Sequence, residues 1–241
     1  MNEAVKKIIS KVVLSDRKIR IKLLGDSITH GVGGSGFEQD GESFISGFAR
    51  NTKGYCWANS FKSYMEERFD CEVINNACTG TKTEFIINNF DTLVDPSDDI
   101  VICTIGTNNR HQFFKYAPKH TKREHMEEFY RNVITLNEMF KKANIDVIFV
   151  ANIPASAKNE LDGPDYWRIF NMSDVNDVYM KASAECGFAF ISLYISFVEY
   201  CHISGTSVDS LLDDGLHPND KGYDVIFSLI LRELGLGEKT V

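Results

Sequence analysis

Short apolar runs alternate with longer amphipathic stretches along most of this chain. Five short runs rich in isoleucine, valine and phenylalanine predict buried strands over residues 19–24, 71–75, 99–105, 146–150 and 188–191. Apolar residues at helical spacing predict helices over residues 57–69, 123–142, 173–186 and 219–234. Strands that alternate with helices form parallel sheets covered on both faces. The pattern therefore predicts an α/β fold, a three-layer αβα sandwich around a flavodoxin-like five-stranded parallel sheet.

The first 18 residues differ from the rest of the chain. Apolar residues recur at helical spacing up to Leu14, with lysines between them. We expect a helical arm over residues 1–18, packed on the domain or on a second copy, and a single domain over residues 19–241. The lysines exclude a secretory signal, and no apolar stretch is long enough to span a bilayer. We therefore expect a cytoplasmic protein.

Composition and charge narrow the class of protein. A chain of 241 residues with 43% hydrophobic residues can bury one large core. The formal net charge of -8 argues against nucleic-acid binding, which needs a basic face. None of the six cysteines belongs to a C-x-x-C pair, so we expect free thiols in a reducing compartment rather than a disulfide framework.

Polar and small residues follow the predicted strands where the chain leaves the sheet. Ser27 follows the first strand, Gly80 closes the segment after the second, and Asn108 follows the third. Asp214 and His217 come after the fifth strand. The carboxyl ends of parallel strands lie along one edge, where open α/β sheets have their active sites. We therefore expect these five residues to converge.

The residue types suit acyl transfer. A serine hydroxyl is a weak nucleophile that needs a base, and His217 can accept the proton of Ser27 and return it to a leaving group. Asp214 can bind the other imidazole nitrogen and fix its tautomer. The backbone N–H groups of Ser27 and Gly80 and the side chain of Asn108 can donate to the oxyanion of a tetrahedral intermediate.

In sequence order, these segments resemble the four blocks of the SGNH hydrolase family, also called GDSL esterases and lipases. The matching segments are residues 25–29, 75–80, 106–108 and 214–218. The resemblance spans residues 19–234. It implies Ser27 as nucleophile, Gly80 and Asn108 as oxyanion donors, and Asp214 with His217 as the rest of the triad, without a metal or organic cofactor.

Two details are left open by the resemblance. The third block usually ends in aspartate, and this chain has Asn109 there, which puts the local hydrogen bonding in question. Asp213 and Asp214 are adjacent, and only the spacing of three residues to His217 favours Asp214.

Two other kinds of site fit the sequence less well. The glycines of residues 31–36 fit G-x-G-x-x-G, but they neither leave the strand directly nor open a clear helix, as a dinucleotide site requires. We expect a loop that rims the pocket instead. Three histidines lack the spacing of a helical metal pair: His111, His120 and His125.

We therefore expect a serine esterase that hydrolyses a carboxylic ester through an acyl-enzyme. A short acyl group, such as acetyl on a carbohydrate or another small molecule, is the substrate we favour. A lysophospholipase, an acyl thioesterase or an acyltransferase could use the same triad. A non-enzymatic flavodoxin-like module that binds a cofactor at the same sheet edge is the alternative of another class.

Overall fold

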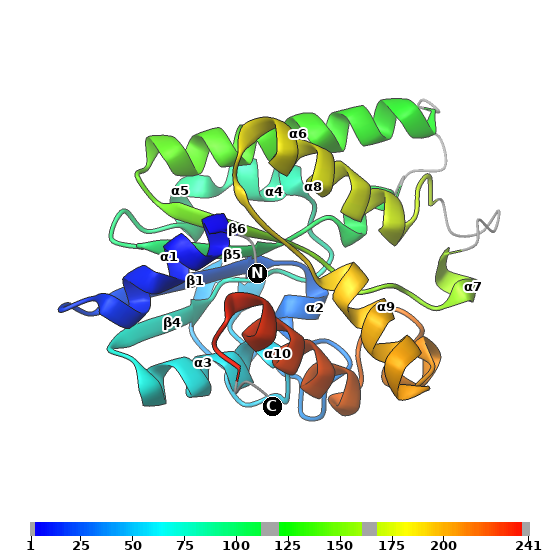
Figure 1. The fold of residues 1–241 in the computed structure, drawn as a ribbon, viewed down its shortest axis with the longest axis horizontal. Helices are drawn as coiled ribbons and strands as arrows, with labels where there is room; N and C mark the ends of the chain where they lie inside the picture. The colour runs from blue at the N-terminus through cyan, green and yellow to red at the C-terminus, as the bar shows by residue number, and fades with distance from the viewer. Residues whose placement is uncertain (1–2, 112–120, 161–167, 238–241) are drawn as a thin grey trace.

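The computed structural model describes residues 3–111, 121–160 and 168–237, which fold around a five-stranded parallel sheet (Figure 1). Its strands run in the order β4-β1-β5-β6-β7. Numbered along the chain, this is the order 2-1-3-4-5 of a flavodoxin-like sheet, so the predicted fold class is confirmed. The bounds are β1 (Ile19–Gly25), β4 (Cys71–Asn75), β5 (Ile100–Thr104), β6 (Asp146–Ala151) and β7 (Ala189–Ser192).

Helices cover both faces of the sheet, which explains why the strands are apolar along most of their length. In Figure 1 one helix layer lies above the sheet and the other below it. On β1, Leu23 packs into the core of one layer and Leu24 into the core of the other. The first layer contains α1 (Glu3–Leu14), α3 (Trp57–Arg68), α9 (Leu193–Ser204) and α10 (Asp220–Leu234). The second contains α4 (Thr83–Asn88), α5 (Phe90–Leu93), α6 (Lys122–Lys142) and α8 (Met172–Cys186).

The predicted long helices lie within two residues of the observed ones. The structure adds elements that the pattern did not predict. Among them are α9 and an antiparallel pair, β2 (Ser43–Ile45) with β3 (Phe48–Ala49), inside the glycine-rich segment after β1. The six cysteines are free thiols, as expected. Among the described helices, none has the length and apolarity needed to cross a bilayer.

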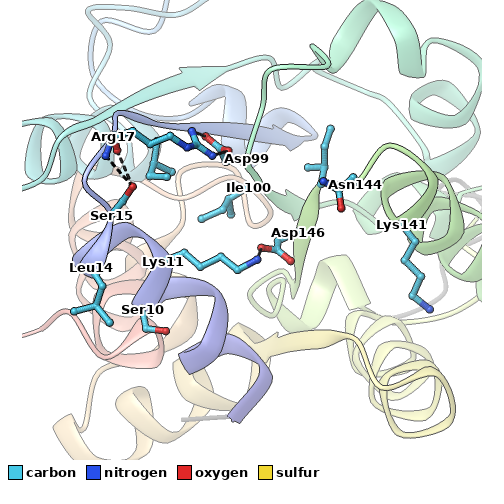
Figure 2. A pocket seen from close by; sticks show the side chains of 12 residues that line it. Ser10, Lys11, Leu14, Ser15, Arg17, Asp99, Ile100, Lys141, Asn144 and Asp146 are labelled. Carbon is cyan, nitrogen blue, oxygen red and sulfur yellow. Dashed lines mark hydrogen bonds and ion pairs between the residues drawn. The ribbon is translucent and has the colours of Figure 1, made fainter.

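Helix α1 packs on the chain's own core. Its buried side belongs to the core that also contains α10, through residues Val5, Ile8, Ile9 and Val12. Beside its carboxyl end, a cleft of about 710 Å³ lies at the amino-terminal edge of the sheet (Figure 2). There Lys11 pairs with Asp146, and Arg17 pairs with Asp99. The cleft thus lies at the edge opposite the strand ends that hold the predicted site.

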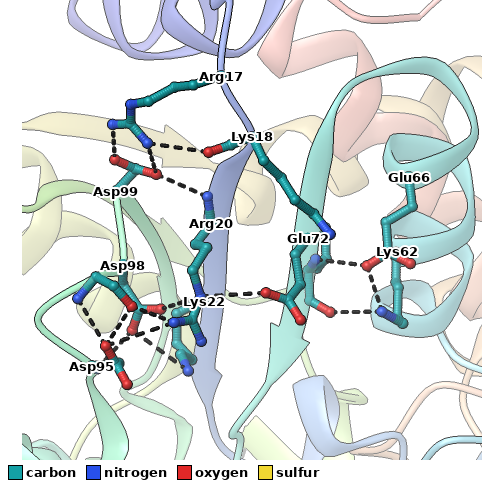
Figure 3. A network of polar contacts seen from close by, with 12 residues as sticks. Arg17, Lys18, Arg20, Lys22, Lys62, Glu66, Glu72, Asp95, Asp98 and Asp99 are labelled. Atoms are coloured by element: carbon teal, nitrogen blue, oxygen red, sulfur yellow. Dashed lines mark hydrogen bonds and ion pairs between the residues drawn. The ribbon is translucent and has the colours of Figure 1, made fainter.

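Two basic residues of β1 lie inside the predicted strand because acidic partners meet them. Lys22 is only 4% exposed, and its Nζ lies 3.5 Å from Asp98 Oδ2 (Figure 3). Burial lowers the pKa of Lys22, and the charge of Asp98 partly offsets this. Arg20 lies beside the same carboxylate and 3.4 Å from Glu72 on β4. The positive charges of Arg20 and Lys22 are therefore balanced by carboxylates of β4 and of the segment that precedes β5.

Strand β4 forms one edge of the sheet, and side chains of α3 cover part of its backbone (Figure 3). The N–H of Val73 donates to Glu66 Oε1 at 2.8 Å. Lys62 Nζ donates to the carbonyl oxygen of Val73 at 2.9 Å. Unpaired edge groups are a template for pairing with another strand. At Val73, side chains of α3 satisfy both the backbone N–H and the carbonyl oxygen.

Candidate active site

Ser27 is placed by a sharp turn at the carboxyl end of β1. The strand ends at Gly25, where an added Cβ would lie 2.8 Å from the carbonyl oxygen of Thr104 on β5, so only glycine fits there. Asp26 then caps the short helix α2 (Ser27–His30), because its Oδ1 accepts the N–H of Ile28 at 3.1 Å. Ser27 begins this helix and is 4% exposed.

His217 reaches Ser27 from 190 residues away in sequence. Its Nε2 lies 2.8 Å from Ser27 Oγ, and its Nδ1 lies 2.7 Å from Asp214 Oδ2. An ionised carboxylate only accepts hydrogen bonds, so Nδ1 carries the proton in the neutral imidazole. Nε2 is then the acceptor for the serine hydroxyl, which is the arrangement of a general base.

Asp214, and not Asp213, is hydrogen-bonded to the imidazole. Asp214 Oδ1 also accepts the N–H groups of Leu216 at 2.9 Å and His217 at 2.8 Å, so the carboxylate is held by its own loop. Partial burial raises the pKa of Asp214, but the hydrogen bonds from His217 and Leu216 outweigh it and hold the pKa below its ordinary value. Asp213 is exposed and meets His217 only through its backbone N–H.

The segment after β6 anchors the loop that carries Asp214 and His217. The N–H of Ser156 donates to the carbonyl oxygen of Gly215 at 2.8 Å. Asn159 Nδ2 donates to the carbonyl oxygen of Asp214 at 3.3 Å. Gly215 has φ of +84°, and an added Cβ would lie 2.6 Å from Ser156 Oγ, so the loop approaches this segment closely. The sequence did not indicate these contacts, because one of them uses only backbone atoms.

The segment that contains Gly80 lies between the serine turn and Asn108. The N–H of Cys78 donates to the carbonyl oxygen of Gly25 at 3.0 Å, which ties the segment to the end of β1. On its other side, Asn108 Nδ2 donates to the carbonyl oxygen of Thr81 at 3.0 Å. Asn108 belongs to the short helix η1 (Thr107–Arg110) after β5. A carboxamide has two N–H donors, so one can still reach a substrate oxygen.

A polar cluster that sequence reasoning missed lies beneath the serine. Asp26 is fully buried, and Asn152 Nδ2 donates both to Asp26 Oδ2 at 3.1 Å and to Thr107 Oγ1 at 2.9 Å. Burial raises the pKa of Asp26 to about 6, although hydrogen bonds from Thr107 and Ile28 lower it. Asn152 directly follows β6, so its place at a strand end was the signal that could have revealed it.

The glycine-rich stretch and the histidines of the sequence take other places. An added Cβ at Gly33 would lie 2.5 Å from the carbonyl oxygen of Pro218 and 3.0 Å from His217 Cβ, so the glycine-rich stretch lies against the loop that carries His217. His111 accepts a hydrogen bond from Arg168, while His120 lies outside the described residues. Within the described parts of the chain, no three His, Cys, Asp or Glu side chains group as metal ligands.

The structure thus brings Ser27, His217 and Asp214 into one hydrogen-bonded chain, with the Gly80 segment and Asn108 beside it. Such a chain can deprotonate the serine as it attacks an acyl carbon.

Comparison with known proteins agrees with this chemistry. A model of the GDSL-like lipase/acylhydrolase family matches residues 23–225. The acetylxylan esterase Axe2 from Geobacillus stearothermophilus has a similar structure, with a TM-score of 0.66 and 17% identity over 91% of this chain and 95% of that one. LAE5, an α/β hydrolase enzyme from the metagenome of Lake Arreo in Spain, gives a TM-score of 0.68 and 19% identity over 91% and 96%. No curated protein matches by sequence. At these identities the structural matches show the fold alone.

Proposed function

Because the chain belongs to the GDSL-like lipase/acylhydrolase family and is an ester-hydrolysing enzyme, we propose that Ser27, His217 and Asp214 are its catalytic triad. The observation that carries the proposal is the distance of 2.8 Å between Ser27 Oγ and His217 Nε2. Family membership also excludes the non-enzymatic cofactor-binding module that the fold alone would allow.

The first half of the reaction forms an acyl-enzyme. Ser27 Oγ attacks the carbonyl carbon of the ester while His217 Nε2 takes the hydroxyl proton. The carbonyl electrons move onto oxygen, where the N–H groups of Ser27 and Gly80 and the Asn108 amide stabilise the charge. Removal of one such donor typically raises the barrier by about 2.7–4 kcal/mol. The intermediate then expels the alcohol, which takes its proton from His217.

The second half restores the enzyme. Water attacks the acyl carbon while His217 takes one of its protons, and the intermediate expels Ser27 Oγ, which regains that proton. The carboxylate of Asp214 stabilises the imidazolium in both halves, as in other serine hydrolases. An acyltransferase would use the same steps with an alcohol in place of water.

For the substrate we propose a short-chain acyl ester, with acetyl on a carbohydrate as the first class to test. The polar loops around Ser27 favour a small acyl group, and Axe2, which has the same fold, is an acetylxylan esterase. A lysophospholipase or an acyl thioesterase would use the same triad and differ in the group that it accepts.

Labelling with a fluorophosphonate tests the nucleophile. We expect wild-type protein to be labelled and Ser27→Ala to be unlabelled and inactive. Labelling that persists in Ser27→Ala would remove Ser27 from the mechanism. A series of nitrophenyl esters then tests the substrate class: kcat/KM should be highest for acetyl or propionyl, and a maximum at long acyl chains would refute the short-chain proposal.

A further inference from the structure

Asn109 stands at the position where the family's third block usually has aspartate, and its side chain has well-defined partners. It is 6% exposed and faces the start of α4. Its Oδ1 accepts the N–H of Thr83 at 3.1 Å. Its Nδ2 donates to Thr83 Oγ1 at 2.9 Å and to Glu84 Oε2 at 3.1 Å. The carboxamide therefore uses both its acceptor and its donor group on two consecutive residues.

Glu84 completes the set of contacts. Its Oε2 also accepts the hydroxyl of Thr83 at 3.0 Å, and Thr83 is fully buried. From α6, Asn132 Nδ2 donates to the same hydroxyl at 3.2 Å. The carboxylate oxygen that faces Asn109 thus receives hydrogen bonds from an amide and a hydroxyl. Because position 84 already supplies a carboxylate acceptor, an amide suits position 109, where it can donate to that carboxylate.

These contacts join the two loops that carry the proposed oxyanion donors. Asn108 donates to the carbonyl oxygen of Thr81, and Lys82 Nζ donates to that of His111 at 2.7 Å. Together with the Asn109 contacts, they bind residues 81–84 to residues 108–111. Gly80 directly precedes the first of these segments, so its position relative to Asn108 depends on this junction.

We infer that Asn109 and Glu84 form a matched donor–acceptor pair that positions Gly80 relative to Asn108. The inference rests on the proposed function, in which these two residues stabilise the oxyanion. An aspartate at position 109 would place a second carboxylate about 3 Å from that of Glu84, where both cannot be ionised without repulsion. Repulsion there would separate the loops, and small displacements of catalytic groups reduce turnover strongly.

Other charged groups near the pair set the background for a pH experiment. Lys82 lies within electrostatic reach of Glu84 and of Glu128 on α6, and burial lowers its pKa, an effect that both acids partly offset. Burial and the charges of Arg110 and neighbouring cations lower the pKa of His111 to about 4, so it stays neutral between pH 5 and 8. A pH effect specific to the Asn109→Asp variant would therefore come from the new pair of carboxylates.

A set of three variants tests the pair: Asn109→Asp, Glu84→Gln and the double variant. We expect Asn109→Asp to lose roughly 10- to 100-fold in kcat on nitrophenyl acetate at pH 8, with KM nearly unchanged. Relative to wild type at each pH, its activity should recover towards pH 5, because the two carboxylates then share a proton. The double variant should regain most of the lost kcat, since the introduced glutamine can donate to the introduced aspartate. Glu84→Gln alone should lose less than Asn109→Asp.

Two outcomes would overturn the inference. One is a kcat per folded enzyme in Asn109→Asp that equals wild type at every pH, even if its unfolding temperature falls, which would make the pair only a support for α4. The other is a double variant no more active than Asn109→Asp. Ser27→Ala is measured in parallel: its activity reports on the proposed triad, so a failed triad and a failed pair give different results.

Discussion

The hydrogen bond between Asp214 and His217 gives a prediction that separates two adjacent acids. In Asp214→Asn the side chain keeps its shape, and its oxygen can still accept the N–H groups of Leu216 and His217. Its NH2 group would then lie about where Oδ2 now is, 2.7 Å from His217 Nδ1. Because an amide N–H donates, it favours the tautomer with the proton on Nε2. That tautomer cannot accept the proton of Ser27.

The magnitude follows from the role of the acid. The corresponding change in a serine protease, where the acid is buried, lowers kcat by about 10⁴-fold, or about 5.5 kcal/mol. The Asp214 side chain is 53% exposed, so water can replace part of its interaction with the imidazole. We therefore expect a smaller loss, of roughly 10²- to 10⁴-fold in kcat, with KM changed little.

Asp213→Asn is the matched control, because it makes the same chemical change one residue away. Among the described residues its carboxylate makes no hydrogen bond, and the backbone N–H that meets His217 is retained. We expect its kcat on nitrophenyl acetate at pH 8 to stay within about twofold of wild type, as for most exposed substitutions. An Asp214→Asn enzyme that keeps more than a tenth of wild-type kcat, or an equal loss in Asp213→Asn, would refute the assignment.

Two further predictions concern stability and loop position. Burial raises the pKa of Asp26 from 3.8 to about 6, so folding favours its protonated form, and its charge should lower the free energy of unfolding by about 3 kcal/mol. This loss develops as pH rises from about 4 to 6. Across that window the free energies of unfolding of wild type and Asp26→Asn, measured from denaturation curves, should therefore diverge. If the two free energies change with pH in parallel, the prediction is wrong. Gly215→Ala should lower kcat at least tenfold, because its Cβ would lie 2.5 Å from Asn159 Nδ2. Gly47→Ala is the control, because Gly47 has φ of +83° but an added Cβ there would meet nothing within 4 Å, so this variant should keep wild-type kcat. An equal loss of kcat in Gly47→Ala and Gly215→Ala would mean that backbone strain, and not the contact with Asn159, is the cause.

The sheet was predictable because its strands are apolar, short and separated by helical patterns. The same logic failed for α9, whose apolar residues lie on several sides, so that no polar face marks a helical period. The pair of β2 and β3 is too short to show alternation, and it lies in a segment dominated by glycine and polar residues. Elements without a contrast between faces were therefore the ones that the pattern missed.

For the site, residues at the ends of β1, β4 and β5 were predictable because their chemistry marks them. After β6 the signal was weaker, because it consisted of the place of Asn152 at the strand end. Asn152 acts through a buried carboxylate, and Ser156 holds Gly215 through its backbone N–H, which every residue except proline carries. The partners of Asn109 were also hidden, since they depend on how residues 81–84 meet η1 in space.

The hydrogen bonds that Lys62 and Glu66 make with the backbone of Val73 affect association between copies of this protein at high concentration. A foreign strand that tried to dock along β4 would first have to displace a lysine and a glutamate already bonded to that backbone. The docking strand would only replace hydrogen bonds that the backbone of Val73 already makes, so its binding would gain little free energy. At Val73, helix α3 therefore disfavours the addition of a further strand to the outermost strand of the sheet.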